Sequence, residues 1–203
     1  MKVLGIMGSP RKNGNADLLL DQALNGAREA GAETEKLPAA DLKVAPCLAC
    51  RGCERTGICV VHDTMTDIYP KLSGADAIIV SSPIFFMGLP GQLKALIDRC
   101  QPFWVRKYLL HKPIYMSDES SENIGVLGTL TRRGLFIAVG ATNLPRTFDA
   151  VRLEVQSFFH CIEVKYSDEL LIPDIEEHGA IANNPEAMSQ AYRAGEKLVK
   201  ATS

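Results

Sequence analysis

The stretch Lys2-Val-Leu-Gly-Ile-Met-Gly8, followed by Ser9-Pro-Arg-Lys-Asn-Gly-Asn15, decides the fold class of this chain. Its first part is short and apolar, which is typical of a strand that is buried on both faces of a parallel sheet. Its second part is a loop rich in Gly, Pro and Asn, and a helical pattern of apolar residues follows over Asn15–Gly31. A buried strand, a polar loop and a helix in this order predict the first βα unit of an α/β protein.

The same alternation of strand and helix continues along the chain. Further apolar runs predict strands at Thr34–Leu37, Ala75–Ser82, Leu135–Val139 and, as a fifth region, Ile162–Tyr166 with Leu170–Ile172. Helical patterns follow Pro90 and span Thr147–Phe159 and Pro185–Ala201. Right-handed crossovers between such strands place helices on both faces of one parallel sheet.

The length of 203 residues predicts a single domain over residues 1–203. Two segments fit the alternation poorly. One is a cysteine-bearing loop from about residue 44 to 64, which we expect to be ordered without regular structure, and the other is an insertion from about residue 103 to 133. We expect the insertion to pack near the site or on a partner subunit.

The composition excludes several classes of protein. Hydrophobic residues make up 46% and charged residues 23%, which is ordinary globular usage and not that of a disordered chain. The net charge of -2, from 24 acidic and 22 basic residues, argues against a nucleic-acid partner. No apolar run reaches the ~18 residues of a membrane span, and the N-terminal stretch is too short for a signal peptide. We therefore expect a cytoplasmic protein without a membrane partner.

The first loop, Gly8–Asn15, has the composition of an anion site. Backbone N–H groups at a helix N-terminus attract negative charge, and Arg11 adds a bidentate partner for phosphate. The loop matches neither the Walker A motif nor G-x-G-x-x-G, so a single phosphate monoester is favoured over a triphosphate or a pyrophosphate. The alternative is a plain turn before a capped helix.

The second loop, Ser82–Pro90, is apolar and aromatic where a solvent-exposed loop would be polar. A flat aromatic ligand would account for this composition, and Gly88 would let it approach the backbone closely. The alternative is that Phe85 and Phe86 cap the core or are buried in a dimer interface. A third loop, Gly140–Asn143, is compatible with ligand binding but gives little evidence for it.

Four of the six cysteines form a compact motif with the spacing C-x2-C-x2-C-x5-C, at Cys47, Cys50, Cys53 and Cys59. The first two spacings, which join Cys47, Cys50 and Cys53, are those of bacterial ferredoxin clusters, whereas structural zinc sites usually separate two pairs of ligands. An iron–sulfur cluster is therefore favoured, with a zinc site and unligated or disulfide-forming thiols as alternatives. We expect the other two, Cys100 and Cys161, to be small buried hydrophobes.

Taken together, these motifs resemble those of the iron–sulfur flavoproteins, within the NADPH-dependent FMN reductase group of flavodoxin-like fold. The similar motifs are, in order, Gly8–Asn15, Pro46–Cys59, Ser82–Phe86 and Leu93–Arg99, so the similarity is dense up to about residue 100. The resemblance implies a doubly wound, five-stranded parallel sheet of order 2-1-3-4-5. Two features depart from the family pattern: Phe85-Phe86 stands where a tyrosine is common, and the insertion is long.

The resemblance also implies two cofactors and an oligomer. FMN would be held at its phosphate by Ser9, Arg11, Asn13, Gly14, Asn15 and Ala16, and at its isoalloxazine by Pro83, Ile84, Phe85, Phe86, Gly88, Gly140, Ala141 and Thr142. A 4Fe-4S cluster would be held by Cys47, Cys50, Cys53 and Cys59. The chain would form a homodimer or a homotetramer.

The function that follows is an FMN-binding electron-transfer oxidoreductase whose electron donor is NAD(P)H or a small redox protein. The four histidines are scattered and form no motif, so no catalytic residue is assigned. The alternatives are an NAD(P)H-dependent FMN or quinone reductase without an assembled cluster, a redox sensor that is not an enzyme, and a zinc-stapled FMN-binding module.

Overall fold

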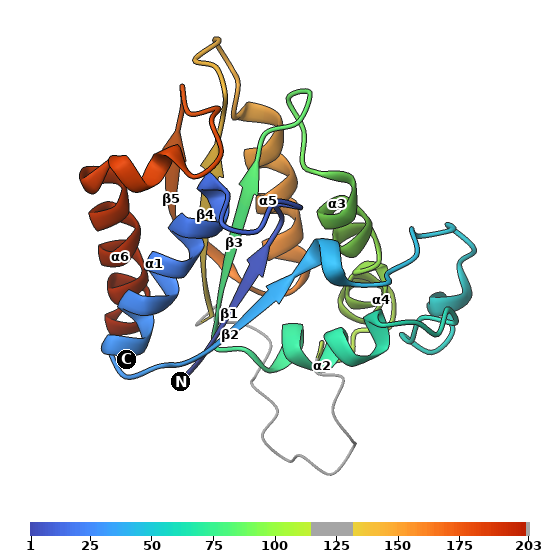
Figure 1. Ribbon diagram of the computed structural model, residues 1–203. Coiled ribbons are helices and arrows are strands. Elements are labelled where there is room, and N and C mark those ends of the chain that lie inside the picture. Colours follow the sequence, from blue (N-terminus) through green and yellow to red (C-terminus); the bar gives the residue numbers. More distant parts are fainter. Residues whose placement is uncertain (115–131, 202–203) are drawn as a thin grey trace.

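The computed structural model describes residues 1–114 and 132–201. In these residues one sheet has the strand order β2-β1-β3-β4-β5, at the centre of Figure 1. Its strands are β1 (Lys2–Met7), β2 (Glu33–Pro38), β3 (Ala77–Pro83), β4 (Arg133–Val139) and β5 (Lys165–Ile172). All neighbouring strands pair in parallel, which confirms the doubly wound, flavodoxin-like sheet of order 2-1-3-4-5.

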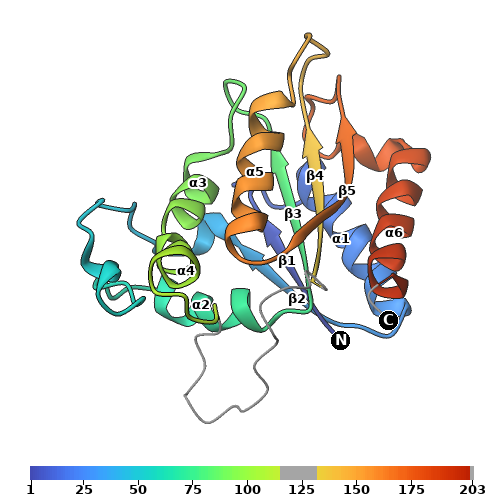
Figure 2. The ribbon, with the colours of Figure 1, turned by 180° about the vertical axis from the view of Figure 1, so that it is seen from behind.

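Helices cover both faces of the sheet, as Figures 1 and 2 show from opposite sides. One face carries α1 (Asn15–Glu29) and α6 (Pro185–Lys200). The other carries α2 (Met65–Gly74), α3 (Gly91–Asp98), α4 (Gln101–Trp104) and α5 (Asp149–Cys161). The remaining short helices are η1 (Ala39–Asp41), η2 (Gly52–Glu54), η3 (Val105–Leu109) and η4 (Ala180–Asn183). In the described part of the chain, no helix is long and apolar enough to span a membrane.

The central strand β3 divides the hydrophobic core into two halves. Its residues from Ala77 to Ser82 are all buried. Because successive side chains point to opposite faces, Ile78 and Val80 pack with α2, α3 and α5, while Ala77 and Ile79 pack with α1 and α6. Burial on both faces explains why the strand appears in the sequence as a continuous apolar run.

The edge strand β5 is one continuous strand, whereas the sequence predicts it in two pieces. The polar stretch around Asp168 and Glu169 separates those pieces. In the structure Asp168 accepts a hydrogen bond from Lys197 of α6 at 2.7 Å, and Arg152 of α5 donates to Glu169 at 2.8 Å. Because basic residues of α5 and α6 pair with these two acidic side chains, the edge strand continues through a polar stretch whose composition predicts a loop.

Helix α2 is an element that the sequence does not predict. Pro70 lies inside it, and a proline in a helix interior is normally a breaker. Helix α2 begins where Asp63 Oδ1 accepts a hydrogen bond from the Met65 N–H at 2.9 Å. Its apolar side packs into the core under β1 and β3, so tertiary burial outweighs the local propensity.

The expected insertion begins as an integral part of the core. Phe103, Val105 and Ile114 are each no more than 1% exposed. Residues 115–131, which make up most of the expected insertion, lie outside the described residues. Its placement near the site or on a partner subunit stays a prediction.

Helices α1 and α6 pack with their backbones in close contact. Gly26 of α1 faces the Tyr192 backbone, and Gly195 of α6 faces the Ala23 backbone. A Cβ atom at either glycine would overlap a carbonyl oxygen of the other helix. Only a residue without a side chain allows this approach.

We expect Gly195→Ala to lower the free energy of unfolding by about 1–3 kcal/mol, because the added methyl group must push the helices apart. Urea unfolding monitored by circular dichroism measures the change. Gly74→Ala in α2 is the matched control: nothing lies within 4 Å of a Cβ there, so it should be neutral or slightly stabilising. Equal stability of Gly195→Ala and the wild type would contradict the backbone contact.

Candidate functional site

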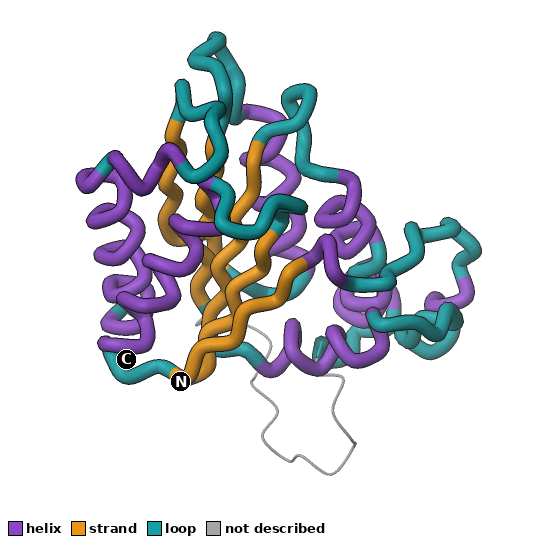
Figure 3. Tube along the Cα trace, in the orientation of Figure 1, coloured by secondary structure: helices purple, strands orange, loops and turns teal. Residues whose placement is uncertain are grey.

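The loops that follow the strands gather at one edge of the sheet, as Figure 3 shows. Loops after β1, β3, β4 and β5 line a cavity of about 260 Å³ there. The lining residues are Ser9, Arg11, Gly14, Asn15, Ala16, Pro83, Ile84, Phe85, Val139, Ala141, Ile175, Glu176 and His178. In open α/β sheets ligands bind outside the carboxyl ends of the strands, so this cavity is the first candidate site.

Most residues that the resemblance assigns to FMN line this cavity. They are Ser9, Arg11, Gly14, Asn15, Ala16, Pro83, Ile84, Phe85 and Ala141. The assigned residues that are not among the lining residues are Asn13, Phe86, Gly88, Gly140 and Thr142. The structure therefore brings the first two loops together at one cavity, and the third contributes through Ala141.

The first loop is held by its own hydrogen bonds against the N-terminus of α1. The buried Ser9 Oγ accepts from the Arg11 N–H at 3.1 Å and donates to the Arg11 carbonyl at 3.2 Å. Asp17 accepts from the Asn13 N–H at 2.8 Å. Gly14, Asn15 and Ala16 at the helix start face the cavity, so the positive end of the helix dipole is directed at it. This arrangement suits an anion.

A segment after β5 also lines the cavity, and the sequence does not reveal it. It contributes Ile175, Glu176 and His178. The Asn15 side chain ties it to the first loop: Nδ2 donates to the Glu177 carbonyl at 2.9 Å, and Oδ1 accepts from the Ile181 N–H at 3.1 Å. His178 Nε2 donates to the Lys12 carbonyl at 3.0 Å. No local signal could predict contacts across more than 160 residues of sequence.

The second loop contains a strained turn at its tip. Phe85 and Gly88 exchange two backbone hydrogen bonds, and Phe86 and Met87 between them have positive φ values of 49° and 63°. Two left-handed residues make a tight hairpin turn that favours Asn-Gly, and bulky residues adopt it only at a cost. The Phe86 side chain is fully exposed, so the alternative that it caps the core is wrong.

The cysteine-bearing loop projects from the body beside α3 and α4 (Figure 1). As expected, its only regular structure is the short helix η2. All four motif cysteines line a single cavity of about 270 Å³. Among the described residues, no three His, Cys, Asp or Glu side chains converge closely enough to hold one metal ion. Burial raises the pKa of the Cys53 thiol, and the neighbouring motif thiols raise it further.

The backbone of this loop adopts left-handed conformations at Ala49 and Arg51, with φ values of 50° and 60°. The right-handed turn of η2 follows Arg51 directly. Alternating left- and right-handed residues direct successive N–H groups into one concavity, which binds anions and is common at iron–sulfur sites. The cysteine loop thus has a backbone suited to a negatively charged group.

A buried ion pair anchors this loop to the body. Arg99, at the end of α3, is 1% exposed and pairs with Asp63 at 2.6 Å. Burial opposes the charge on Asp63, but hydrogen bonds from Arg99 and from the N–H groups of Ala45 and Met65 outweigh it and lower the pKa of the carboxyl. Burial likewise opposes the charge on Arg99, and the hydrogen bond and the negative charge of Asp63 raise the guanidinium pKa.

The two cysteines outside the motif are not among the residues that line the cavity of the four motif cysteines. Cys100 is buried in the core, as predicted, and its Sγ donates to the Leu96 carbonyl. Cys161 is partly buried near it, and burial raises its pKa to about 11. Both side chains behave as small apolar groups.

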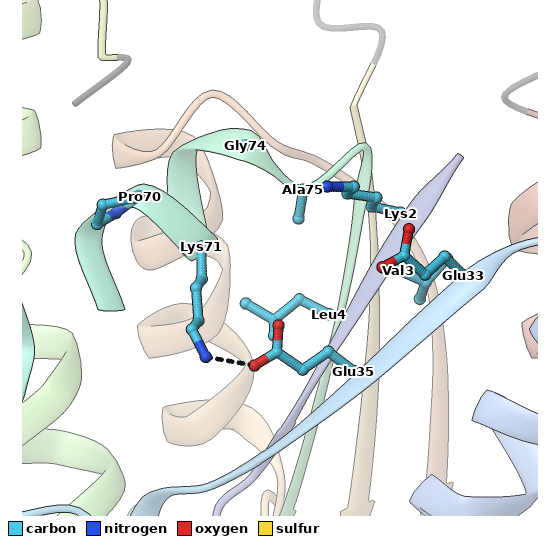
Figure 4. A pocket seen from close by; sticks show the side chains of 9 residues that line it. All are labelled: Lys2, Val3, Leu4, Glu33, Glu35, Pro70, Lys71, Gly74 and Ala75. Atoms are coloured by element: carbon cyan, nitrogen blue, oxygen red, sulfur yellow. Dashed lines mark hydrogen bonds and ion pairs between the residues drawn. The ribbon is translucent and has the colours of Figure 1, made fainter. Parts of the chain in front are cut away.

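A further hollow of about 250 Å³ lies at the opposite end of the sheet (Figure 4). It is bounded by the amino ends of β1 and β2 and by the end of α2, and the Lys71–Glu35 ion pair crosses its wall. It lies away from the carboxyl ends of the strands, and among the described residues no loop of ligand-binding composition lines it. We therefore do not assign it a function.

Comparison with known proteins gives a family match over most of the chain. The sequence pattern of the family described as NADPH-dependent FMN reductase matches residues 1–151. An iron–sulfur flavoprotein of Methanocaldococcus jannaschii is 44% identical over 112 residues, 55% of this chain and 58% of the relative. Another, of Methanosarcina thermophila, is 46% identical over 99 residues, 49% of this chain and 52% of the relative. The chain thus spans about half the length of the curated relatives that it matches.

Solved structures share the fold at low identity. A flavone reductase superposes with a TM-score of 0.71 at 22% identity, covering 100% of this chain and 63% of that protein. An NAD(P)H:quinone oxidoreductase from Methanothermobacter marburgensis gives a TM-score of 0.69 at 16% identity, covering 98% and 96%. At these identities the likeness supports the architecture alone.

Replacing the strained turn with Phe86→Asn and Met87→Gly should raise the free energy of unfolding by about 1 kcal/mol, because this pair suits positive φ values. Urea unfolding measures the gain. Leu144→Asn, which also removes an exposed apolar side chain but has no positive φ, is the control and should change stability by less than about 0.5 kcal/mol. A double variant no more stable than the wild type would show that the turn stores no strain.

Proposed function

This chain belongs to the NADPH-dependent FMN reductase family, and we propose that it is an FMN-binding oxidoreductase that also carries a 4Fe-4S cluster. The observation that carries the proposal is that all four cysteines of the compact motif line one cavity. A separate cavity has the anion-binding and apolar loops that a flavin nucleotide needs. Helix α3 connects the two, since the second loop precedes it and Arg99 follows it.

The residues of the first cavity fit FMN. The phosphate would lie at the N-terminus of α1, where backbone N–H groups and Arg11 offer positive charge. The isoalloxazine would lie against Pro83, Ile84 and Phe85, whose apolar surfaces exclude water from one side of the ring. Bound there, FMN accepts and releases electrons one or two at a time. The chain itself binds and orients the cofactor, and we assign no catalytic residue.

The residues of the second cavity fit a cluster better than a single ion. Structural zinc sites usually separate two pairs of ligands, whereas three of the cysteines here follow at consecutive x2 spacings. A cluster of four iron atoms is larger than one ion, and the thiols surround a cavity instead of a point. Cysteine thiolates are its usual ligands, and it supplies one-electron transfer when bound. The left-handed backbone at Ala49 and Arg51 supports the same proposal.

The electron donor would be NAD(P)H or a small redox protein, and the chain would act in the cytoplasm as a homodimer or homotetramer. The apolar tip of the second loop, at Phe86 and Met87, and the exposed Leu48, Ile58 and Val60 of the cysteine loop are surfaces that partner subunits would cover. None of the six cysteines is joined in a disulfide, which is compatible with a reducing compartment.

Cluster content is tested on protein purified without oxygen. We expect about four iron and four acid-labile sulfide per chain, together with FMN. Cys59→Ala should lose iron and sulfide but retain FMN, because the two cavities are separate. Cys161→Ala, outside the motif, is the control and should retain both. FMN without iron and sulfide in the wild type would favour the FMN or quinone reductase without a cluster, and zinc without sulfide would favour the zinc-stapled module.

The phosphate site is tested with Arg11→Ala. We expect FMN affinity to fall about 10- to 100-fold, because a charge-assisted hydrogen bond contributes about 1.5–3 kcal/mol. Riboflavin, which lacks the phosphate, should bind the variant and the wild type equally. Quenching of flavin fluorescence measures both affinities. Lys12→Ala is the control, since Lys12 pairs with Asp41 outside the cavity. An equal loss for FMN and riboflavin would place the phosphate elsewhere.

A further inference from the structure

Arg99 has one hydrogen-bond donor that finds no acceptor among the described residues. A guanidinium carries five N–H donors. Nη1 donates to Asp63 Oδ2 at 2.6 Å and to the Ala45 carbonyl at 2.9 Å, and Nη2 donates to Asp63 Oδ1 and to the Val61 carbonyl, both at 3.1 Å. The fifth donor, on Nε, is buried and has no partner in residues 1–114 and 132–201.

An unpartnered donor on a buried cation needs an explanation. Buried polar groups in native proteins nearly always have a partner, since an unpaired group has lost its water without compensation. Arg99 is 1% exposed and lines the cavity shared by the four motif cysteines. The acceptor that the described residues do not supply is therefore expected in the group that fills this cavity.

Arg99 also ties together the two ends of the cysteine loop. Ala45, two residues before Cys47, and Val61, two residues after Cys59, are both held by its terminal nitrogens. Asp63 also holds the start of the cysteine loop, because its carboxylate accepts from the Ala45 N–H at 2.9 Å. Cys47 and Cys59 each lie two residues from one of these contacts. Cys47 is exposed, whereas Cys59 is partly buried against the core, where the Arg99 side chain is also buried.

We propose that Arg99 is a positioning residue for the iron–sulfur cluster, and that its Nε–H donates a hydrogen bond to the sulfur at the Cys59 corner. This inference rests on the proposed function, because it requires a cluster on the four thiolates. Reduction adds negative charge to the cluster, so a donor to sulfur stabilises the reduced state more than the oxidised state. Arg99 therefore raises the reduction potential of the cluster.

Arg99→Lys tests the proposal, because lysine keeps the positive charge opposite Asp63 but has no Nε–H donor. We expect the variant to retain about four iron per chain and to be reduced about tenfold less readily, a shift of about 59 mV to lower potential for a one-electron couple. An anaerobic redox titration, followed by EPR of the reduced cluster, measures the potential without any assay of turnover.

Arg152→Lys is the matched control. Arg152 makes a similar two-pronged contact with Glu169, but there the Nε donor already has its acceptor in the chain, at 2.8 Å. Its variant should leave the cluster potential unchanged. An unchanged potential in loaded Arg99→Lys would overturn the inference and leave the proposed function intact. A wild type without iron and sulfide would instead overturn the proposed cluster, and the inference with it.

A second measurement applies if Arg99→Lys does not retain the cluster. Wild-type protein with ¹⁵N only at arginine Nε is reduced, and pulsed EPR detects any coupling between the label and the cluster. Arg51→Lys removes any coupling that comes from Arg51, which also lines the cavity. A ¹⁵N coupling that persists in Arg51→Lys supports the hydrogen bond from Arg99. A spectrum of the reduced protein without ¹⁵N coupling overturns the inference.

Discussion

All strands of the described sheet run in the same direction, so their carboxyl ends meet at one edge. Helices cover both faces of the sheet, and apolar side chains fill the space between the sheet and these helices. The loops at this edge are therefore the part of the fold where a ligand can bind. Residues as far apart in sequence as Ser9, Pro83 and Ala141 therefore line one cavity. The N-terminus of α1 is held at that cavity by the hydrogen bonds of Asn15 to the segment after β5 and by the Ser81 hydroxyl of β3, which donates to the Ala16 carbonyl.

The cysteine loop obeys a different constraint. It has little regular structure of its own, so hydrogen bonds from a buried cation take the place of a strand or a helix. Arg99 contacts both ends of the loop and pairs with Asp63, which also starts α2. Removing either partner of a buried ion pair leaves an uncompensated buried charge, so the conformation of the loop depends on both Arg99 and Asp63. Both ends of the loop that carries the exposed thiols Cys47 and Cys50 are thus hydrogen-bonded to a buried ion pair.

Residues other than glycine with positive φ values occur in the loops that we assign to cofactors. Phe86 and Met87 in the second loop, and Ala49 and Arg51 in the cysteine loop, have positive φ values without being glycine. Such conformations cost free energy and persist only where the surrounding structure enforces them. Residues with this conformation also occur elsewhere in the chain, for example Glu163 after α5, so strain alone does not identify a site. It supports an assignment that already rests on composition and burial.

Local sequence pattern was sufficient for the strand and helix alternation, for the first two loops and for the cysteine motif. Each of these signals lies within a dozen or so neighbouring residues, and apolar runs, glycines and cysteine spacing act over that range. Tertiary structure alone decided α2, which forms around Pro70 because its apolar face is buried, and the continuity of β5, whose acidic residues are paired by distant helices. It also decided that the segment with His178 closes the first cavity and that Arg99 lines the second. These contacts join residues far apart in the chain, and their energies come from burial and pairing, which no short stretch of sequence encodes.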